Sequence, residues 1–248
     1  MKKLFLIIIA LFISAAFIYA DYYLKEVEHT DAFTVGGVTT PAVDHKNEYW
    51  IKDKKMVIAT LDWGKTFIFD LTKKRFVFIN VKAKTYVEMS VPLDPAKIFS
   101  DQLALKYEMY KETCSLAKTG KTKKILGKTC TGYETKSWKV SAGTKYGEIE
   151  AMVWASTDVP FDLDVYYGMV RCIRVLLNRD EVFRKNFEKV KGCLLGVDMT
   201  MVRQGRGTKI KATHRIVEIV EKKAPPHIFS IPRDYVKKEK LTYSDLWE

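Results

Sequence analysis

Residues 47–89 read NEYWIKDKKMVIATLDWGKTFIFDLTKKRFVFINVKAKTYVEM, and this stretch decides the fold. It contains five short runs rich in aromatic and β-branched residues, which are typical of β-strands. Lysine-rich gaps of hairpin length separate these runs. The stretch therefore predicts an antiparallel meander, which is one wide sheet with two apolar faces to cover. The five runs cover residues 49–51, 55–59, 66–69, 75–79 and 85–89.

The first twenty residues have the layout of a secretory signal peptide. Two lysines precede an uncharged apolar run at residues 4–18, and Ala20 is a small residue at a cleavage position. An uncleaved membrane anchor is the alternative, but the run is shorter than the roughly 20 residues that span a bilayer. We therefore expect residues 1–20 to be removed, with cleavage after Ala16 as a second option.

The rest of the chain reads as one soluble unit. No second apolar run reaches spanning length, and no cysteine lies near the cleavage position as a site for lipid attachment. We expect secretion across the inner membrane into the periplasm, and the mature protein is not predicted to be a lipoprotein. Its length suits a single domain over residues 21–236, followed by a polar C-terminal tail over residues 237–248.

The chain is basic, and its lysines gather in turns. Removal of the two N-terminal lysines leaves 40 basic against 30 acidic residues, a net charge of +10. Nucleic acid is the wrong partner for an exported protein, whereas an anionic membrane surface or an acidic wall polymer fits this charge. Alternatively, turn lysines keep a β-rich protein soluble and protect its strand edges. The turn lysines are Lys52, Lys54, Lys55, Lys73, Lys74, Lys82, Lys84, Lys118, Lys121, Lys123 and Lys124.

Four cysteines lie in the predicted mature chain, which suits an oxidising compartment. Cys114 and Cys130 flank a predicted hairpin. Cys172 lies in a helical segment, and Cys193 opens the strand that follows it. Pairing neighbours gives the disulfides Cys114–Cys130 and Cys172–Cys193, one of three possible connectivities. A metal site is the weaker interpretation, because the chain has no close Cys-x-x-Cys pair and its four histidines are scattered.

Two segments read as helical. In residues 92–112, Asp94 is a suitable N-cap and Pro95 suits the first helical position. Residues 161–190 carry more apolar residues than one narrow stripe, and they predict two helices broken near 178–180.

The other segments read as strands and loops. Residues 22–30 alternate and predict the first strand, whereas residues 31–46 read as a loop because they contain two adjacent glycines and a proline. Residues 113–117 and 121–126 predict two strands joined by a turn at 119–120. Further strands are predicted at residues 129–140, 147–156, 194–203 and 208–221.

Several short motifs make the chain resemble a known family over most of residues 22–236. The chain resembles the LolA-like and LolB-like periplasmic lipoprotein carriers, and within that group a set of exported domains of unassigned function. The resemblance implies an α+β fold, namely an incomplete, strongly curved and mostly antiparallel β-barrel whose open concave side is covered by helices. In the carriers this cavity receives acyl chains, and no catalytic residue comes with the resemblance. The motifs are Phe67-Ile68-Phe69-Asp70, residues 84–89, residues 125–134, residues 153–156 leading to Val159-Pro160, and residues 229–235.

Large apolar side chains supply candidates for a hydrophobic cavity. Alternate residues of a strand share a face, so Phe67 and Phe69 fall on one side, as do Phe76 and Phe78, and Met152 and Trp154. A lipid tail buried there gains about 0.8 kcal/mol per methylene. The alternative is a sheet and helices packed solid at ordinary interior density, which needs the same residues. The candidate ligand-binding residues are Phe67, Phe69, Phe76, Phe78, Met152, Trp154, Phe99 and Leu103.

No catalytic signature is present. Gly-x-Ser-x-Gly and His-Glu-x-x-His do not occur, and the three Gly-Lys-Thr triplets lack the first glycine of a phosphate loop. Asp162 and Asp164 suit a helix start. His214 stands alone in a predicted strand, where a histidine is more often structural. We therefore expect no enzyme activity, no cofactor and no metal site.

Three functions from different classes remain open. The first is a binding or carrier domain for a lipid, a lipoprotein acyl chain or another apolar ligand. The second is an envelope interaction module that uses basic turns or a sheet edge against a protein or an anionic surface. The third is an enzyme with an unrecognised site. The oligomeric state is not indicated.

Overall fold

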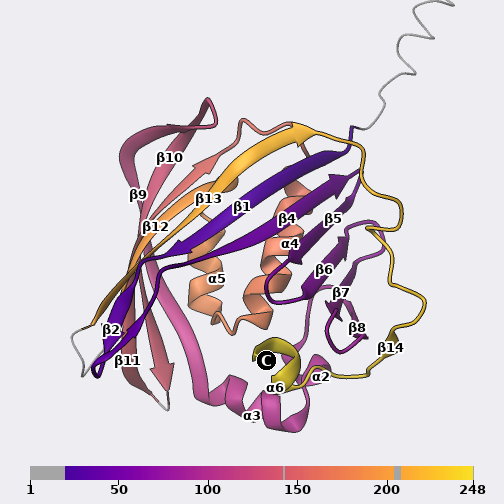
Figure 1. The fold of residues 1–248 in the computed structure, drawn as a ribbon, viewed down its shortest axis with the longest axis horizontal. Coiled ribbons are helices and arrows are strands. Elements are labelled where there is room, and N and C mark those ends of the chain that lie inside the picture. Colours follow the sequence, from indigo (N-terminus) through magenta and orange to yellow (C-terminus); the bar gives the residue numbers. More distant parts are fainter. Residues whose placement is uncertain (1–19, 142, 204–207, 248) are drawn as a thin grey trace, which may run out of the picture.

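The structure is a computed structural model that describes residues 20–141, 143–203 and 208–247. The predicted signal peptide, apart from Ala20, lies outside the described residues. One large sheet dominates the fold, and a short separate hairpin extends from its first loop (Figure 1). The strands of the large sheet are β1 (Tyr22–Thr30), β4 (Val43–Lys52), β5 (Lys55–Thr60), β6 (Lys65–Asp70), β7 (Arg75–Asn80), β8 (Thr85–Ser90), β9 (Tyr110–Ile125), β10 (Lys128–Ser141), β11 (Thr144–Ser156), β12 (Cys193–Arg203), β13 (Lys209–Glu221) and β14 (Val236–Lys237).

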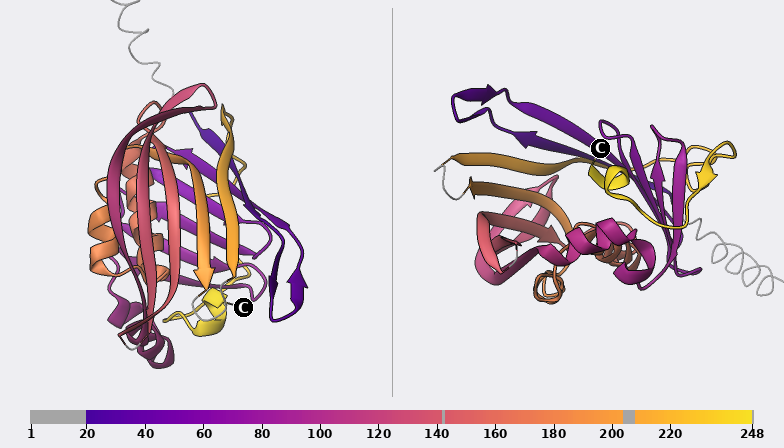
Figure 2. Two further views of the ribbon diagram at one scale, coloured as in Figure 1. Left: turned by 90° about the vertical axis from the view of Figure 1, so that its left-hand side faces the viewer. Right: turned by 90° about the horizontal axis from the view of Figure 1, so that it is seen from below.

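The twelve strands confirm the predicted fold class. Their order is β14-β8-β7-β6-β5-β4-β1-β13-β12-β11-β10-β9, and every neighbouring pair is antiparallel except β14 and β8. The sheet curves into an arc whose two edge strands, β14 and β9, stay apart, so the barrel is incomplete. Figure 2 shows the helices lying across the open side of this arc.

The meander predicted from residues 47–89 is confirmed as β4 to β8. The four later runs match their strands to within two residues at each end, and residues 49–51 lie in the longer β4. The first strand, Tyr22–Thr30, also has the predicted bounds. In this region the alternation of apolar residues and the spacing of the turns indicate the same strand bounds, so the local sequence is sufficient to predict them.

Two strand predictions were wrong. Residues 113–117 and 121–125 belong to one strand, β9. The chain does not turn at residues 119–120, because the Thr119 hydroxyl donates to the Gly132 carbonyl of β10 and the pairing of the two strands shifts register there. The predicted loop at residues 31–46 contains the hairpin of β2 (Phe33–Val35) and β3 (Val38–Thr40), and β4 begins within it. Gly36 and Gly37 both have positive φ, which is the requirement of a tight hairpin turn.

The two helical regions are confirmed, each as a pair of helices. Ser100 and Asp180 cap the second helix of each pair, and Asp162 caps the longest. That helix, α4, lies on the concave face of the meander and brings Gly168 against the ring of Phe69. The second helix of the later pair, α5, lies against β9. The helices are α2 (Pro95–Ile98), α3 (Asp101–Met109), α4 (Leu163–Leu176), α5 (Glu181–Phe187) and the C-terminal α6 (Tyr243–Trp247).

The C-terminal segment covers the convex face and then turns around the β8 edge. Phe229 and Ile231 pack on a cluster of buried side chains on that face, including Trp50 and Val77. The chain then pairs β14 with β8, and it continues into residues that were expected to be a polar tail. Leu241 there is fully buried, so this segment packs against the domain.

All four cysteines are free and buried, in contrast to the predicted disulfides. Cys114 lies opposite Ser137 on β10, seven residues along that strand from Cys130. At about 3.3 Å per residue this separation is far beyond the roughly 7 Å limit between bridged Cα atoms. Cys172 and Cys193 both lie in the main core as thiols. Burial raises the pKa of Cys172 to about 12, which suits a small core side chain better than a reactive one.

Candidate functional site

Two connected clefts lie between the concave face of the sheet and the helices. One has a volume of about 290 Å³ and the other about 610 Å³, and Leu177, Arg179 and His214 line both. Most of the remaining lining is apolar. The smaller cleft is lined by residues including Leu24, Ile58, Ile173, Phe183, Val197 and Ile216, and the larger by Leu103, Ile149, Met199, Met201, Leu246 and Trp247.

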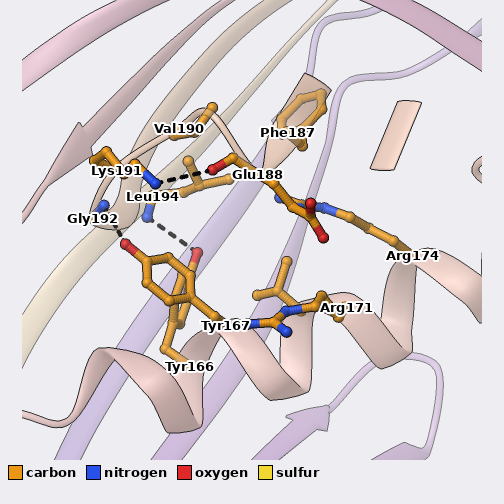
Figure 3. A pocket seen from close by; sticks show the side chains of 11 residues that line it. Tyr166, Tyr167, Arg171, Arg174, Phe187, Glu188, Val190, Lys191, Gly192 and Leu194 are labelled. Carbon is orange, nitrogen blue, oxygen red and sulfur yellow. Dashed lines mark hydrogen bonds between the residues drawn. The ribbon is translucent and has the colours of Figure 1, made fainter. Parts of the chain in front are cut away.

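A third cleft of about 310 Å³ adjoins the smaller of these and lies between α4 and the segment that joins α5 to β12 (Figure 3). The hydroxyl of Tyr167 accepts from the Gly192 amide at 2.6 Å, and that of Tyr166 accepts from the Leu194 amide at 3.1 Å. These bonds fix the wall of the cleft, because they tie α4 to the start of β12.

The third cleft has a basic lining. Arg171, Arg174 and Lys191 face it with Glu188 as the acidic side chain among the lining residues. Arg174 also lines the smaller interior cleft, and its guanidinium lies 4.6 Å from the centre of the Phe187 ring. Burial lowers the pKa of Arg174, yet an arginine stays charged at neutral pH. Positive charge therefore stands where this basic cleft meets the apolar interior.

Five polar side chains form a network on the sheet floor of the smaller cleft. Glu26 and Glu28 project from β1 and His214 from β13, where it lies opposite Glu28. The Asn47 amide donates to both glutamates, at 2.9 Å to Glu26 and 2.6 Å to Glu28, and the Tyr49 hydroxyl donates to Glu26. The His214 Nδ1 atom lies 3.7 Å from an oxygen of each glutamate.

The surroundings shift the pKa values of the two glutamates in opposite directions. Burial would raise the pKa of Glu26, but the nearby imidazole, hydroxyl and amide groups outweigh it, so the pKa is lowered. Burial raises the pKa of Glu28. Burial would lower the pKa of His214, but the two carboxylates facing it raise it. The network therefore concentrates charge at the floor of an otherwise apolar cleft.

The connection between α4 and α5 is fastened to the start of β9. Glu112 is only 5% exposed, accepts from the Ser137 hydroxyl at 3.0 Å and forms an ion pair with Arg179. Its backbone bonds both Asn178 and Asp180. Burial lowers the pKa of Arg179 to about 10, so this guanidinium depends on its carboxylate partner. The helix connection is thus a fixed wall of the larger cleft.

The aromatic cavity candidates lie together, beside the clefts. Phe69, Phe76, Phe78 and Phe99 belong to the main core, each no more than 1% exposed. Phe67 packs on this group, with its ring 5.6 Å from that of Phe78. Of the eight candidates, Leu103 lines the larger interior cleft. The phenylalanines pack mainly under α4, whereas the clefts open toward β1, β12 and β13.

Met152 and Trp154 point to the other face of their strand. Val153 between them packs in a cluster with Phe187 of α5, so its neighbours point away from that helix. The Trp154 indole donates to Asp198 at 3.1 Å, and Met152 lines a shallow groove with Asp198. Trp154 nevertheless belongs to the same buried cluster as Phe69, and both Met152 and Phe67 pack against that cluster. Whether any of the eight candidates contacts a ligand stays a prediction.

Sequence reasoning missed the polar network. The Glu26-x-Glu28 alternation was visible and places both carboxylates on one face. However, His214 lies 186 positions beyond Glu28, and only the pairing of β1 with β13 brings them together.

Comparisons with known proteins add little. No family model and no curated protein matches the chain. Thirty chains of solved structures match. One is the crystal structure of a DUF1329 family protein from Desulfovibrio piger, which is 10% identical, with 89% of this chain and 94% of that chain covered and a TM-score of 0.30. So distant a likeness carries no argument, and the resemblance to lipoprotein carriers stays a prediction. Within the described residues, no helix is long and apolar enough to cross a membrane.

Proposed function

We propose that this protein is an exported, non-catalytic binding or carrier domain for an amphipathic ligand, such as a lipid or the acyl chain of a lipoprotein. The observation that carries the proposal is the pair of connected, mainly apolar clefts under the helices. The volume of the larger cleft falls within the range of about 300–1,000 Å³ that is typical of small-molecule sites, and so does the combined volume of the two clefts. The periplasm is the proposed compartment.

The lining supports a ligand with two chemically distinct parts. An apolar tail of ten methylenes buried in the clefts would gain about 8 kcal/mol from leaving water, at about 0.8 kcal/mol each. Arg171, Arg174 and Lys191 offer positive charge to an anionic head group in the adjoining cleft. Head and tail sites are contiguous, because Arg174 lines both the basic cleft and the smaller interior cleft.

A pair of substitutions on one strand tests this proposal. Met199→Trp fills the larger cleft, and Thr200→Trp places the same bulk on the opposite face of β12 as the matched control. We expect Met199→Trp to weaken binding of a fluorescent long-chain fatty acid at least tenfold and Thr200→Trp to leave it within twofold. Equal affinities for both variants, or no binding by the unsubstituted protein, would contradict a ligand in this cleft.

The interaction module is less well supported. Several turn lysines pair with acidic side chains of the same chain, as Lys52 does with Asp21 and Lys84 with Asp234. In an antiparallel meander, successive turns also alternate between the two ends of the strands. The lysines of the β4–β5 turn and those of the β7–β8 turn therefore lie at opposite ends, which does not favour a single basic docking surface.

A further inference from the structure

Three side chains with metal-binding atoms converge where the two interior clefts meet. Glu26 and Glu28 are two positions apart on β1, so their side chains leave the same face of the sheet. His214 lies opposite Glu28 on the neighbouring strand. One atom from each of the three lies within 4.8 Å of the other two, and all three residues line the smaller cleft.

The spacing of these atoms suits a bound ion. Zinc ligands lie about 2.1 Å from the metal, so two of them in a tetrahedral site are separated by about 3.4 Å. The His214 Nδ1 atom lies 3.7 Å from an oxygen of each glutamate. Such a separation is too long for a good hydrogen bond but close to that between two ligands of one ion.

The surroundings hold the carboxylates in place. Asn47 donates to both glutamates and Tyr49 donates to Glu26, as the outer partners of metal ligands do. The side chains of Glu26, Glu28 and His214 are 14%, 20% and 29% exposed, respectively. Within the cluster two carboxylates face one imidazole, and a divalent cation bound between them would neutralise both.

We propose that Glu26, Glu28 and His214 bind one divalent first-row transition metal ion at the floor of the cleft. A set of one imidazole and two carboxylates suits such an ion better than Mg²⁺ or Ca²⁺, which prefer oxygen ligands alone. Three protein ligands leave a fourth position open, and here it faces the cleft. The site does not depend on the lipid-binding proposal, because it rests on the network of side chains alone.

Zinc titration of the metal-free protein by calorimetry tests the site. We expect one Zn²⁺ per chain, and much weaker binding of Mg²⁺ and Ca²⁺. His214→Ala and Glu28→Gln should each lower the zinc affinity at least about tenfold, since loss of even an outer partner costs about 10–100-fold. The matched control is His29→Ala, because His29 follows Glu28 on β1 but projects from the opposite face, where it lies 2.6 Å from Asp44 and 3.1 Å from Asp31.

Each outcome decides the proposal. A zinc affinity lowered at least about tenfold in both cleft variants, with the His29→Ala affinity unchanged, supports it. No stoichiometric zinc binding by the unsubstituted protein would overturn it, as would a zinc affinity that is unchanged in Glu28→Gln or that falls equally in His29→Ala. Glu28→Gln keeps the size of the side chain, so it decides the matter if circular dichroism shows that His214→Ala is unfolded.

Discussion

At the scale of single residues, one close contact sets how near α4 approaches the sheet. A Cβ atom built on Gly168 would lie 2.2 Å from the Phe69 ring, so only glycine permits this spacing. Phe69 is 1% exposed and has little room to move. A glycine usually weakens a helix interior, and here the weakening is compensated by the packing of a large aromatic ring.

We expect Gly168→Ala to destabilise the protein by about 1–3 kcal/mol through overpacking, although alanine favours the helix by about 1 kcal/mol. The measurement is urea unfolding followed by circular dichroism. Gly120→Ala is the control, because a Cβ at Gly120 meets nothing within 4 Å, and its effect should stay within about 0.5 kcal/mol. A Gly168→Ala protein as stable as the parent would show that α4 does not pack as described.

Asp245 gives the C-terminal helix a dependence on pH. It is 3% exposed and accepts from the Thr242 amide at 2.8 Å and from Lys238. Burial would raise the pKa of Asp245, but Lys238 and Thr242 outweigh it and lower the pKa. Because the folded pKa lies below the unfolded value of about 3.9, the stabilisation is complete above that value and is lost as the pH falls through the folded pKa.

Asp245→Asn should therefore cost about 1.5–3 kcal/mol at pH 7, as expected for hydrogen bonds to a charged group. The difference between the two proteins should shrink as the pH falls below about 4. Urea unfolding of both proteins from pH 7 to pH 3 measures this difference. A difference that stays constant over the whole range would mean that the carboxylate charge is not what stabilises the segment.

At the scale of elements, the helix pair α4–α5 is attached to the sheet at two levels. The helices pack against strands, and the connection between them is bonded to the start of β9. Glu112 at the start of β9 binds Arg179 by an ion pair and bonds the backbone on both sides of it. This contact joins residues that are 67 positions apart in the chain. It makes the helix pair a permanent wall of the larger cleft, in contrast to a lid that opens freely.

We expect Glu112→Ala to destabilise the protein by about 3 kcal/mol, because it leaves the charge of Arg179, whose side chain is only 25% exposed, without its partner. Glu181→Ala is the matched control, since Glu181 forms an exposed ion pair with Lys185 in α5 at 2.7 Å, and such pairs contribute little to stability. Urea unfolding gives both values, and amide hydrogen exchange should accelerate in α4 and α5 of Glu112→Ala alone. Similar costs for the two variants would refute the fixed wall.

Patterns of neighbouring residues correctly predicted the short strands of the meander and the break between the two later helices. The strands β5 to β8 follow from alternation and tight turns, and the break between α4 and α5 follows from the polar residues 178–180. The long β9 was missed because Thr119-Gly120 has turn composition, whereas its hydrogen bonds are made across the sheet to Gly132. Likewise, the pairing of β1 with β13 and the burial of the last residues depend on contacts between distant parts of the chain, which no local pattern encodes.

At the scale of the whole molecule, the curved sheet is filled unevenly. Phe69 of β6 and the two phenylalanines of β7 pack to full burial beside α4, as in an ordinary core. Toward β1, β12 and β13 the same concave face borders the two interior clefts. The sequence contained the apolar residues that both arrangements require, so only the placement of the helices distinguishes a packed region from an open one.

Native mass spectrometry of residues 21–248, purified from a host that exports the protein and combined with lipid extraction of the same sample, tests the central claim most directly. A ligand-binding cleft predicts a stoichiometric adduct that is released on denaturation and extracted as a lipid or an acylated peptide. A single mass equal to that of the bare chain, unchanged after incubation with excess long-chain fatty acid, would contradict the carrier proposal and identify the domain as a packed scaffold.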